Sequence, residues 1–140
     1  MSAGAVIAIR ADGSPAMGGG HIVRCIALAK ALRDADGEPR LFFNHEAAPL
    51  ISSQDVKGLA IDFVEPGSAV FATALAGLAE KRTVDVVIDH YGWAQSEEKA
   101  LRGLARQIVV IDDLANRPHD CDILIDQNFG RKAEDYSGLV

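Results

Sequence analysis

A histidine that directly follows three glycines is the residue of this sequence best placed to do chemistry. Glycines 18–20 precede His21, and they lie between an apolar run at residues 5–9 and an amphipathic stretch at residues 22–32. That order predicts a strand, a glycine loop and a helix. Unpaired backbone amides at a helix start favour anionic or electron-rich ligands. Because the positive end of the helix dipole disfavours imidazolium, we expect a neutral His21 that acts as a general base.

The same junction has structural and functional alternatives. A tight turn that binds no ligand, with an exposed or capping histidine, would also explain it. The spacing does not fit the dinucleotide pattern GxGxxG, since Val23 stands at the third glycine position, and no lysine follows to make a P-loop. Cys25 lies four residues after His21 on the same helix face, where a Cys–His nucleophilic pair is the functional alternative. Because Cys25 falls on the apolar stripe of the helix, we interpret it as a buried core thiol.

Composition limits the classes of function. The 140 residues are 49% hydrophobic and 24% charged, with a formal net charge of −6. This length suits one domain with a real core. The acidic balance argues against non-specific binding to nucleic acid or to anionic membranes. No run approaches the roughly 18 apolar residues that span a bilayer.

The N-terminus and the cysteines indicate the compartment. No positively charged segment precedes an apolar one in residues 1–4, so we expect no signal peptide and a cytoplasmic location. In that compartment a disulfide between Cys25 and Cys121 is not expected. Their spacing also makes a poor zinc site, and we predict neither a metal nor a cofactor.

Strands and helices alternate along the chain. Short apolar runs predict strands buried on both faces at residues 5–9, 41–43, 84–88, 108–111 and 123–125, with a weaker candidate at 59–64. Helical patterns lie between them at residues 22–32, 47–56, 68–81 and 96–105, with Ser68 and Ser96 as N-caps of the last two. We therefore predict an α/β fold with a Rossmann-like, doubly wound parallel sheet. The segment after residue 126 shows no clear helix and ends on an open, partly apolar stretch, which we interpret as the first half of a longer protein.

Polar side chains gather where four of these strands end. In such sheets ligands bind at the carboxyl ends of the strands, so a crevice is expected there. The residues concerned are Arg10, Asp12, Ser14, Asp89, His90, Tyr91, Asp112, Asp113, Asp126 and Asn128.

These polar residues also have more than one interpretation. Asp89, Asp112 and Asp113 are able to hold Mg²⁺, or to cap loops and accept bonds from backbone amides. Tyr91 offers a hydroxyl and a stacking ring, or simple packing over the strand ends. His45 and His119 look like loop residues, and we assign them no role.

Seven short segments run in order from residue 10 to the end of the chain. They are residues 10–14 (RADGS), 18–24 (GGGHIVR), 27–30 (ALAK), 87–92 (VIDHYG), 111–113 (IDD), 119–124 (HDCDIL) and 135–139 (DYSGL). This set resembles the UDP-sugar hydrolases of pseudaminic acid biosynthesis, whereas the glycine–histidine element alone is also found in related glycosyltransferases.

The resemblance implies a fold, a reaction and a site. The fold is the N-terminal half of a GT-B fold, and the reaction is metal-free, inverting hydrolysis of a UDP-linked diacetamido-trideoxy sugar at its anomeric carbon. The family's histidine falls on His21, which implies a general base that activates water. The family's Asp-His-Tyr segment falls on Asp89, His90 and Tyr91. With the glycine loop and the other strand ends, the residues expected to bind substrate are Arg10, Asp12, Gly19, Gly20, Asp89, His90, Tyr91 and Asn128. From strand-end location alone, we expect Asp12 or Asp89 to orient the imidazole or to bind sugar hydroxyls, and Tyr91 and Asn128 to hold the acetamido groups.

The match departs from the family in two places. Gly19 stands where a larger apolar residue is expected, which would loosen the loop. Residues 1–140 would form the N-terminal, catalytic-side domain, and we expect the C-terminal UDP-binding domain to be absent from this chain. Two further interpretations stay open: a nucleotide-sugar-dependent glycosyltransferase, and a non-catalytic nucleotide-sugar-binding or receiver-like domain suggested by Asp112 and Asp113.

Overall fold

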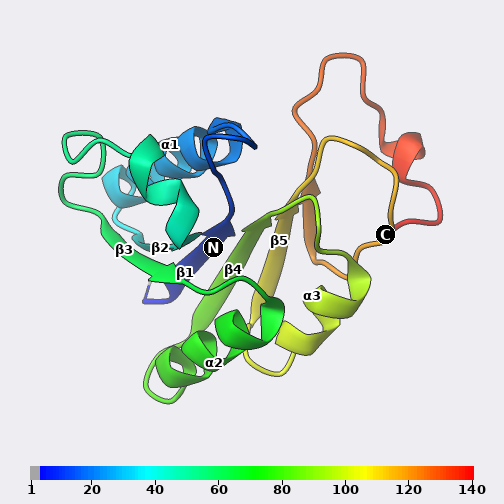
Figure 1. The fold of residues 1–140 in the computed structure, drawn as a ribbon. Helices are drawn as coiled ribbons and strands as arrows, with labels where there is room; N and C mark the ends of the chain where they lie inside the picture. Colours follow the sequence, from blue (N-terminus) through cyan, green and yellow to red (C-terminus); the bar gives the residue numbers. More distant parts are fainter. Residues whose placement is uncertain (1–3) are drawn as a thin grey trace.

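The computed structural model describes residues 4–140, which form a six-stranded sheet whose neighbouring strands all pair in parallel (Figure 1). The strands are β1 (Val6–Ala11), β2 (Glu38–Asn44), β3 (Ala60–Val64), β4 (Val84–Asp89), β5 (Gln107–Ile111) and β6 (Ile123–Ile125). Their order across the sheet is β3-β2-β1-β4-β5-β6. This is the doubly wound Rossmann arrangement, so the predicted fold class is confirmed. Residues 1–3, part of the segment used to judge the signal peptide, lie outside the described range.

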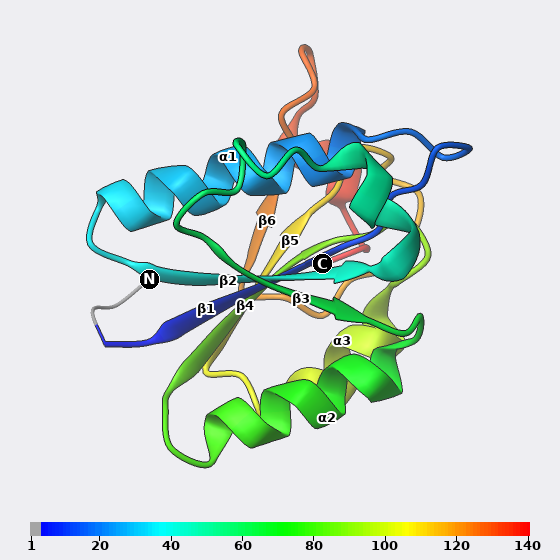
Figure 2. The same ribbon diagram turned by 60° about the vertical axis from the view of Figure 1, so that its left-hand side comes forward.

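Helices cover both faces of the sheet. The helices are α1 (Gly20–Asp34), α2 (Ser68–Ala79) and α3 (Gln95–Leu101), with two short 3₁₀ helices, η1 (His45–Leu50) and η2 (Ala133–Tyr136). Figure 2 shows α1 on one face and α2 and α3 together on the other. No helix within residues 4–140 is both long and apolar enough to cross a membrane.

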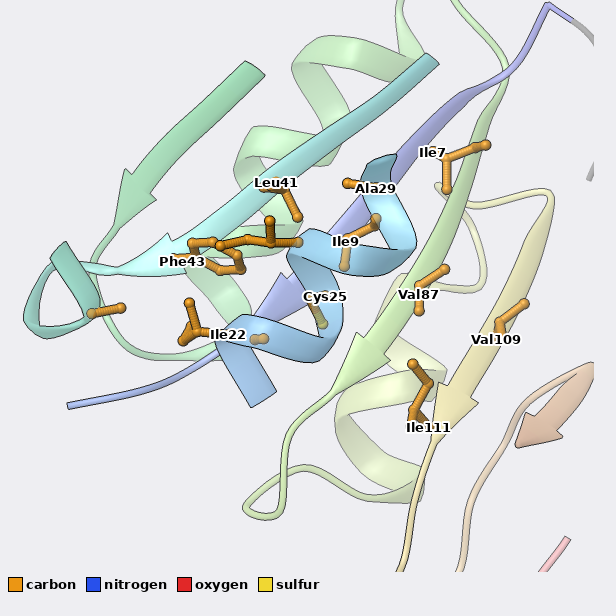
Figure 3. Close-up of a cluster of buried hydrophobic side chains, with 13 residues drawn as sticks. Ile7, Ile9, Ile22, Cys25, Ala29, Leu41, Phe43, Val87, Val109 and Ile111 are labelled. Carbon is orange, nitrogen blue, oxygen red and sulfur yellow. The ribbon is translucent and has the colours of Figure 1, made fainter. Parts of the chain in front are cut away.

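Two apolar clusters hold these layers together, one on each face. Because side chains alternate along a strand, Ile7 and Ile9 of β1 pack in the α1 cluster while Ala8 packs in the α2–α3 cluster. Figure 3 shows Ile22 and Cys25 of α1 pointing toward the strands. The core position predicted for Cys25 is therefore confirmed. The central strands β1 and β4 are buried along their whole length, as predicted, whereas the edge strand β3 is only partly covered. The burial predicted for residues 123–125 is wrong: β6 is the other edge strand, and Ile123 and Ile125 are exposed.

The helix predicted at residues 47–56 is wrong. The chain there forms the short helix η1 and then a series of turns up to residue 58. Pro49 lies within η1 and has no amide hydrogen to donate, and the serines at 52 and 53 favour turns. In the later segment that appeared to lack a helix, η2 forms one 3₁₀ turn.

Both predicted serine caps are also wrong. The N-cap of α2 is Gly67, and Ser68 is already the first helical residue. The N-cap of α3 is Ala94, whose backbone amide donates to Oε1 of Glu97 at 2.7 Å. Ser96 lies inside the helix, and its hydroxyl donates to Oε2 of the same glutamate at 2.6 Å. The Glu97 carboxylate in the first turn therefore accepts a hydrogen bond from the backbone amide at the start of α3, the end that Ser96 was expected to cap.

Candidate functional site at the ends of β1 and β4

The candidate site lies where the order of strands reverses. β1 and β4 are adjacent, and Ala11 at the end of β1 pairs with Asp89 at the end of β4. The chain leaves these two strands toward opposite sides of the sheet, which opens a crevice at their carboxyl ends. Asp12 continues β1, and His90 and Tyr91 continue β4. The polar residues predicted at these two strand ends therefore do meet.

A tight loop delivers His21 to this crevice. The amide of Gly18 donates to the Ser14 carbonyl at 2.7 Å, and the amide of Met17 donates to Oγ of Ser14 at 2.9 Å. Gly18 has a φ of +92°, in the left-handed region that favours glycine. Gly19 is the N-cap of α1, so His21 lies in the first turn of the helix.

The backbone of Gly18 leads to a prediction about stability. Replacing Gly18 with alanine should lower the free energy of unfolding by about 1–2 kcal/mol, because a Cβ is strained at this φ although nothing lies within 4 Å of it. Gly77 in α2 is the matched control: its surroundings are equally open, and alanine there should be neutral or stabilising. Urea unfolding of both variants measures the difference, and equal changes in the two would contradict the strain.

His21 forms one end of a three-residue ionic cluster. Its Nδ1 lies 2.5 Å from Oδ1 of Asp89, whose side chain is 1% exposed. Arg24, one helical turn after His21, holds the same carboxylate with Nε at 2.7 Å from Oδ2 and Nη2 at 2.6 Å from Oδ1. Since a carboxylate only accepts, His21 must donate from Nδ1. The other ring nitrogen, Nε2, makes no hydrogen bond with residues 4–140 and is left to accept a proton.

The environment keeps Asp89 ionised and Cys25 protonated. Burial raises the pKa of the Asp89 carboxyl, but hydrogen bonds from His21 and Arg24 lower it by more than burial raises it. The pKa of Asp89 therefore lies below its usual value. Burial and the neighbouring carboxylate raise the pKa of the Cys25 thiol well above its ordinary value. A buried thiol that stays protonated is not a nucleophile, which disfavours the Cys–His alternative.

Two hollows meet at His21. The smaller has a volume of about 120 Å³ and is lined by Asp12, Met17, His21, Asp89, His90, Tyr91 and Gly92. The larger, more open one has a volume of about 630 Å³ and is lined by Met17, Gly20, His21, Val23, Arg24, Tyr91, Asp113 and Gln127. Three side chains are common to both, so the imidazole lies at their boundary. Together they offer room for a ligand with a compact part and an extended part.

Tyr91 closes one side of the imidazole. Its ring meets that of His21 edge to face, with centroids 4.3 Å apart. The Tyr91 hydroxyl donates to Oδ2 of Asp113 at 2.8 Å, and this hydrogen bond, with some burial, raises the pKa of Tyr91 to about 12. The phenol therefore stays protonated at neutral pH and restricts the rotation of His21.

Three of the predicted binding residues line neither hollow. Arg10 is completely buried behind Asp12, and its Nη1 donates to that carboxylate. A Cβ on Gly19 would meet Leu50 only at 3.7 Å, an ordinary contact, so the backbone does not require glycine there. Asn128 lies on the exposed loop after β6, where its side-chain amide donates to the Asp113 carbonyl at 2.7 Å.

A buried polar network that the sequence reading missed supports the loop after β4. Arg117 donates from Nη2 to the His90 carbonyl at 2.9 Å, from Nε to the Trp93 carbonyl at 2.8 Å and from Nη1 to Oδ1 of Asp112 at 2.8 Å. Oδ2 of Asp112 accepts from the Tyr136 hydroxyl at 2.9 Å. The C-terminal segment thus fixes the backbone that carries His90 and Tyr91.

His119 belongs to the same region, and it lies in a loop as the sequence predicts, but its side chain is buried. It is 3% exposed, and its Nδ1 lies 2.7 Å from Oε2 of Glu98, which is fully buried on α3. Oε1 of Glu98 also accepts from the Asp120 amide at 2.6 Å. The proline turn before His119 gave no sign of this contact, because Glu98 lies 21 residues away in sequence.

Asp112 and Asp113 therefore have structural partners. Asp112 accepts from Arg117, Tyr136 and the Ala115 amide, and Asp113 accepts from Tyr91. Within residues 4–140 no group of three or more His, Cys, Asp or Glu side chains is arranged to hold a metal ion. A receiver-like domain would also have the strand order 2-1-3-4-5, which this sheet does not have.

The buried carboxylates predict how stability depends on pH. For Asp112, as for Asp89, burial raises the pKa, but hydrogen bonds and a neighbouring arginine lower it more. A folded-state pKa below the unfolded value of about 3.9 gives stability that is complete above that pH and is lost as pH falls through the folded pKa. Urea midpoints should therefore fall steeply below about pH 4. Equal midpoints at about pH 5 and pH 3 would contradict this assignment.

A comparison with known proteins finds a match to part of a larger protein. No family model matches the chain. A curated protein of Campylobacter jejuni, named UDP-2,4-diacetamido-2,4,6-trideoxy-beta-L-altropyranose hydrolase, is 30% identical over 134 residues. The match covers 96% of this chain but only 46% of that protein, so the chain spans about half the length of this relative. The resemblance inferred from the sequence is thus confirmed as a match, over nearly the whole of this chain, to part of a UDP-sugar hydrolase.

Proposed function

We propose that this chain carries the catalytic side of an enzyme that hydrolyses a UDP-linked diacetamido-trideoxy sugar, releasing UDP and the free sugar. The observation that carries the proposal is the state of His21: Nδ1 is engaged by Asp89, and Nε2 is unengaged beside a hollow at the strand-order reversal. The match to a protein named as a hydrolase of such a sugar nucleotide supports the choice of substrate.

The reaction assigns each group a role. A water oxygen attacks the anomeric carbon, Nε2 of His21 takes the proton, and the bond from that carbon to the UDP oxygen breaks with its electron pair leaving on UDP. Asp89 stabilises the imidazolium that forms, as the carboxylate of a catalytic triad does. Because UDP is already a good leaving group, positioning and a general base account for the catalysis without further groups.

The hollows suggest where the substrate lies. The smaller hollow suits an attacking water and part of a sugar ring, since one water occupies about 30 Å³ of liquid volume. The larger hollow suits the rest of the ligand, and Gly20 and Arg24 offer donors there. Under the proposal, residues 1–140 are the N-terminal half of a GT-B fold, and a second domain supplies most of the UDP site. A cytoplasmic location stays a prediction from the sequence.

Isotope labelling tests the reaction class. The polypeptide at its full encoded length is incubated with UDP-2,4-diacetamido-2,4,6-trideoxy-β-L-altropyranose in H₂¹⁸O. We expect free sugar together with unlabelled UDP, because cleavage of the carbon–oxygen bond leaves no water oxygen on phosphorus. Labelled UDP would instead mean attack at phosphorus. No release until an acceptor alcohol is added would support the glycosyltransferase alternative.

A further inference from the structure

A second histidine–carboxylate pair lies in the same hollow as His21 and Asp89. His90 follows β4, Asp12 follows β1, and Nε2 of His90 lies 2.7 Å from Oδ2 of Asp12. Both residues line the smaller hollow. The two pairs have the same composition, but their hydrogen bonds give them different chemistry.

The hydrogen bonds of His90 leave it no free ring nitrogen. The backbone amide of Gly92 donates to Nδ1 at 2.9 Å, so Nδ1 carries a lone pair and no proton. Nε2 must then carry the proton and donate it to Asp12. The ring also stacks on Trp93, with centroids 4.8 Å apart and planes 17° from parallel. His90 is therefore a fixed donor, and it is not available as a second base.

The other partner of Asp12 is a buried arginine. Nη1 of Arg10 donates to Oδ1 of Asp12 and, at 2.6 Å, to the Ala11 carbonyl. The guanidinium carbon of Arg10 lies 5.3 Å from the centre of the Trp93 ring. The same indole thus packs against both side chains that hold the carboxylate, which restricts the orientation of Asp12.

Asp12 is consequently an ionised acceptor with spare capacity. Burial raises the pKa of this carboxyl, but the hydrogen bond from His90 and the charge of Arg10 lower it more. A carboxylate offers about four acceptor positions, and each of its oxygens uses one on a protein donor. Its side chain is 16% exposed, and the hollow is the space into which it opens.

We propose that Asp12 is the residue that selects the sugar portion of the ligand, by accepting hydrogen bonds from its neutral N–H or O–H groups. Arg10 and His90 are positioning residues that act through Asp12. The inference rests on the proposed function and adds an orientation to it. The smaller hollow is lined by two carboxylates, Asp12 and Asp89, and by no arginine or lysine, whereas the larger hollow is lined by Arg24 and by one carboxylate, Asp113. The proposal therefore places the diphosphate in the larger hollow, near Arg24.

A comparison of two ligands separates this role from a structural one. UDP has the diphosphate but no sugar ring in the smaller hollow, whereas the UDP-diacetamido-trideoxy sugar has both. Binding is measured by calorimetry in a His21→Asn background, in which turnover is slow, with and without Asp12→Ala. We expect Asp12→Ala to weaken binding of the UDP-sugar at least about tenfold, the worth of a hydrogen bond to a charged group, and to leave UDP binding unchanged.

Control variants guard against loss of folding. Asp62→Ala removes the same charge at the far edge of the sheet, where Asp62 pairs with Arg40, and should change neither affinity. Asp12→Glu keeps the charge but displaces the oxygens, so it should weaken binding of the UDP-sugar alone. Equal weakening of both ligands by Asp12→Ala, or no weakening of either, would overturn the proposal.

The free sugar provides a readout that does not depend on the proposed reaction. N-acetylglucosamine at millimolar concentration should shift the backbone amide resonances of Met17 and Gly92 in the unmodified protein but not in Asp12→Ala. This result without hydrolysis of the UDP-sugar would retain the sugar subsite and reject the proposed function. Hydrolysis without an effect of Asp12 on sugar binding would retain the function and reject the subsite.

Discussion

Replacing His21 with asparagine should lower the rate of UDP release by about 10²–10⁴-fold, the usual contribution of a general base. Asparagine can donate its side-chain N–H to Asp89 and so keep the carboxylate bonded, but its amide does not accept a proton near neutral pH. Affinity for UDP should change little, because the lost group acts on water. Release of UDP measured under single-turnover conditions tests the chemical step.

A second histidine provides the control for this variant. His45 is exposed and pairs with Glu65 at 3.4 Å, away from both hollows. His45→Asn should therefore hydrolyse the UDP-sugar at the unmodified rate. If His21→Asn retained that rate as well, the reaction would remain but His21 would no longer be its base.

Replacing Arg117 with methionine should lower the free energy of unfolding by about 3–5 kcal/mol, the usual cost of breaking a buried ion pair from one side. Asp112 is completely buried, and without Arg117 its charge would keep the Ala115 amide, the Tyr136 hydroxyl and, 3.8 Å away, Nε2 of His119, but no arginine. Two carbonyls in the loop after β4 would lose their donor as well. Methionine keeps the apolar length of the side chain, so the loss reflects the missing guanidinium.

Urea unfolding monitored by circular dichroism measures this change. The matched control is Arg82→Met. Nη2 of Arg82 lies 2.7 Å from Oε2 of Glu38, and both side chains are exposed on the surface. Exposed pairs contribute about 0–1 kcal/mol, so this variant should unfold close to the unmodified protein. Comparable losses in the two variants would mean that Asp112 finds other partners when Arg117 is removed.

The sequence was sufficient to predict the sheet, for identifiable physical reasons. Strands covered on both faces are continuous apolar runs, and β1 and β4 have this form. The strand–glycine–helix order placed His21 near the strand ends, and parallel pairing brought Asp89 to the same edge. The proposed orienting carboxylate had two candidates, Asp12 and Asp89, and the side-chain geometry pairs Asp89 with His21 and Asp12 with His90.

What the sequence could not give are contacts between distant segments. Arg24 falls off the apolar stripe of α1, and its spacing of three from His21 places both residues on one side of the helix. Its carboxylate partner Asp89 lies 65 residues away. Likewise nothing near His119 indicated a buried glutamate on α3. Pairings of this kind depend on how helices pack over the sheet, which local patterns do not encode.

The central claim is that Asp89 fixes His21 with Nε2 unprotonated and free to act as a base. Long-range ¹⁵N–¹H correlation spectra of the unliganded protein, recorded at about pH 8 to stay above the ordinary histidine pKa, report which ring nitrogen carries the proton. We predict a protonated Nδ1 and a lone pair on Nε2 for His21, and the opposite tautomer for His90. A His21 imidazole with its proton on Nε2 would contradict the account.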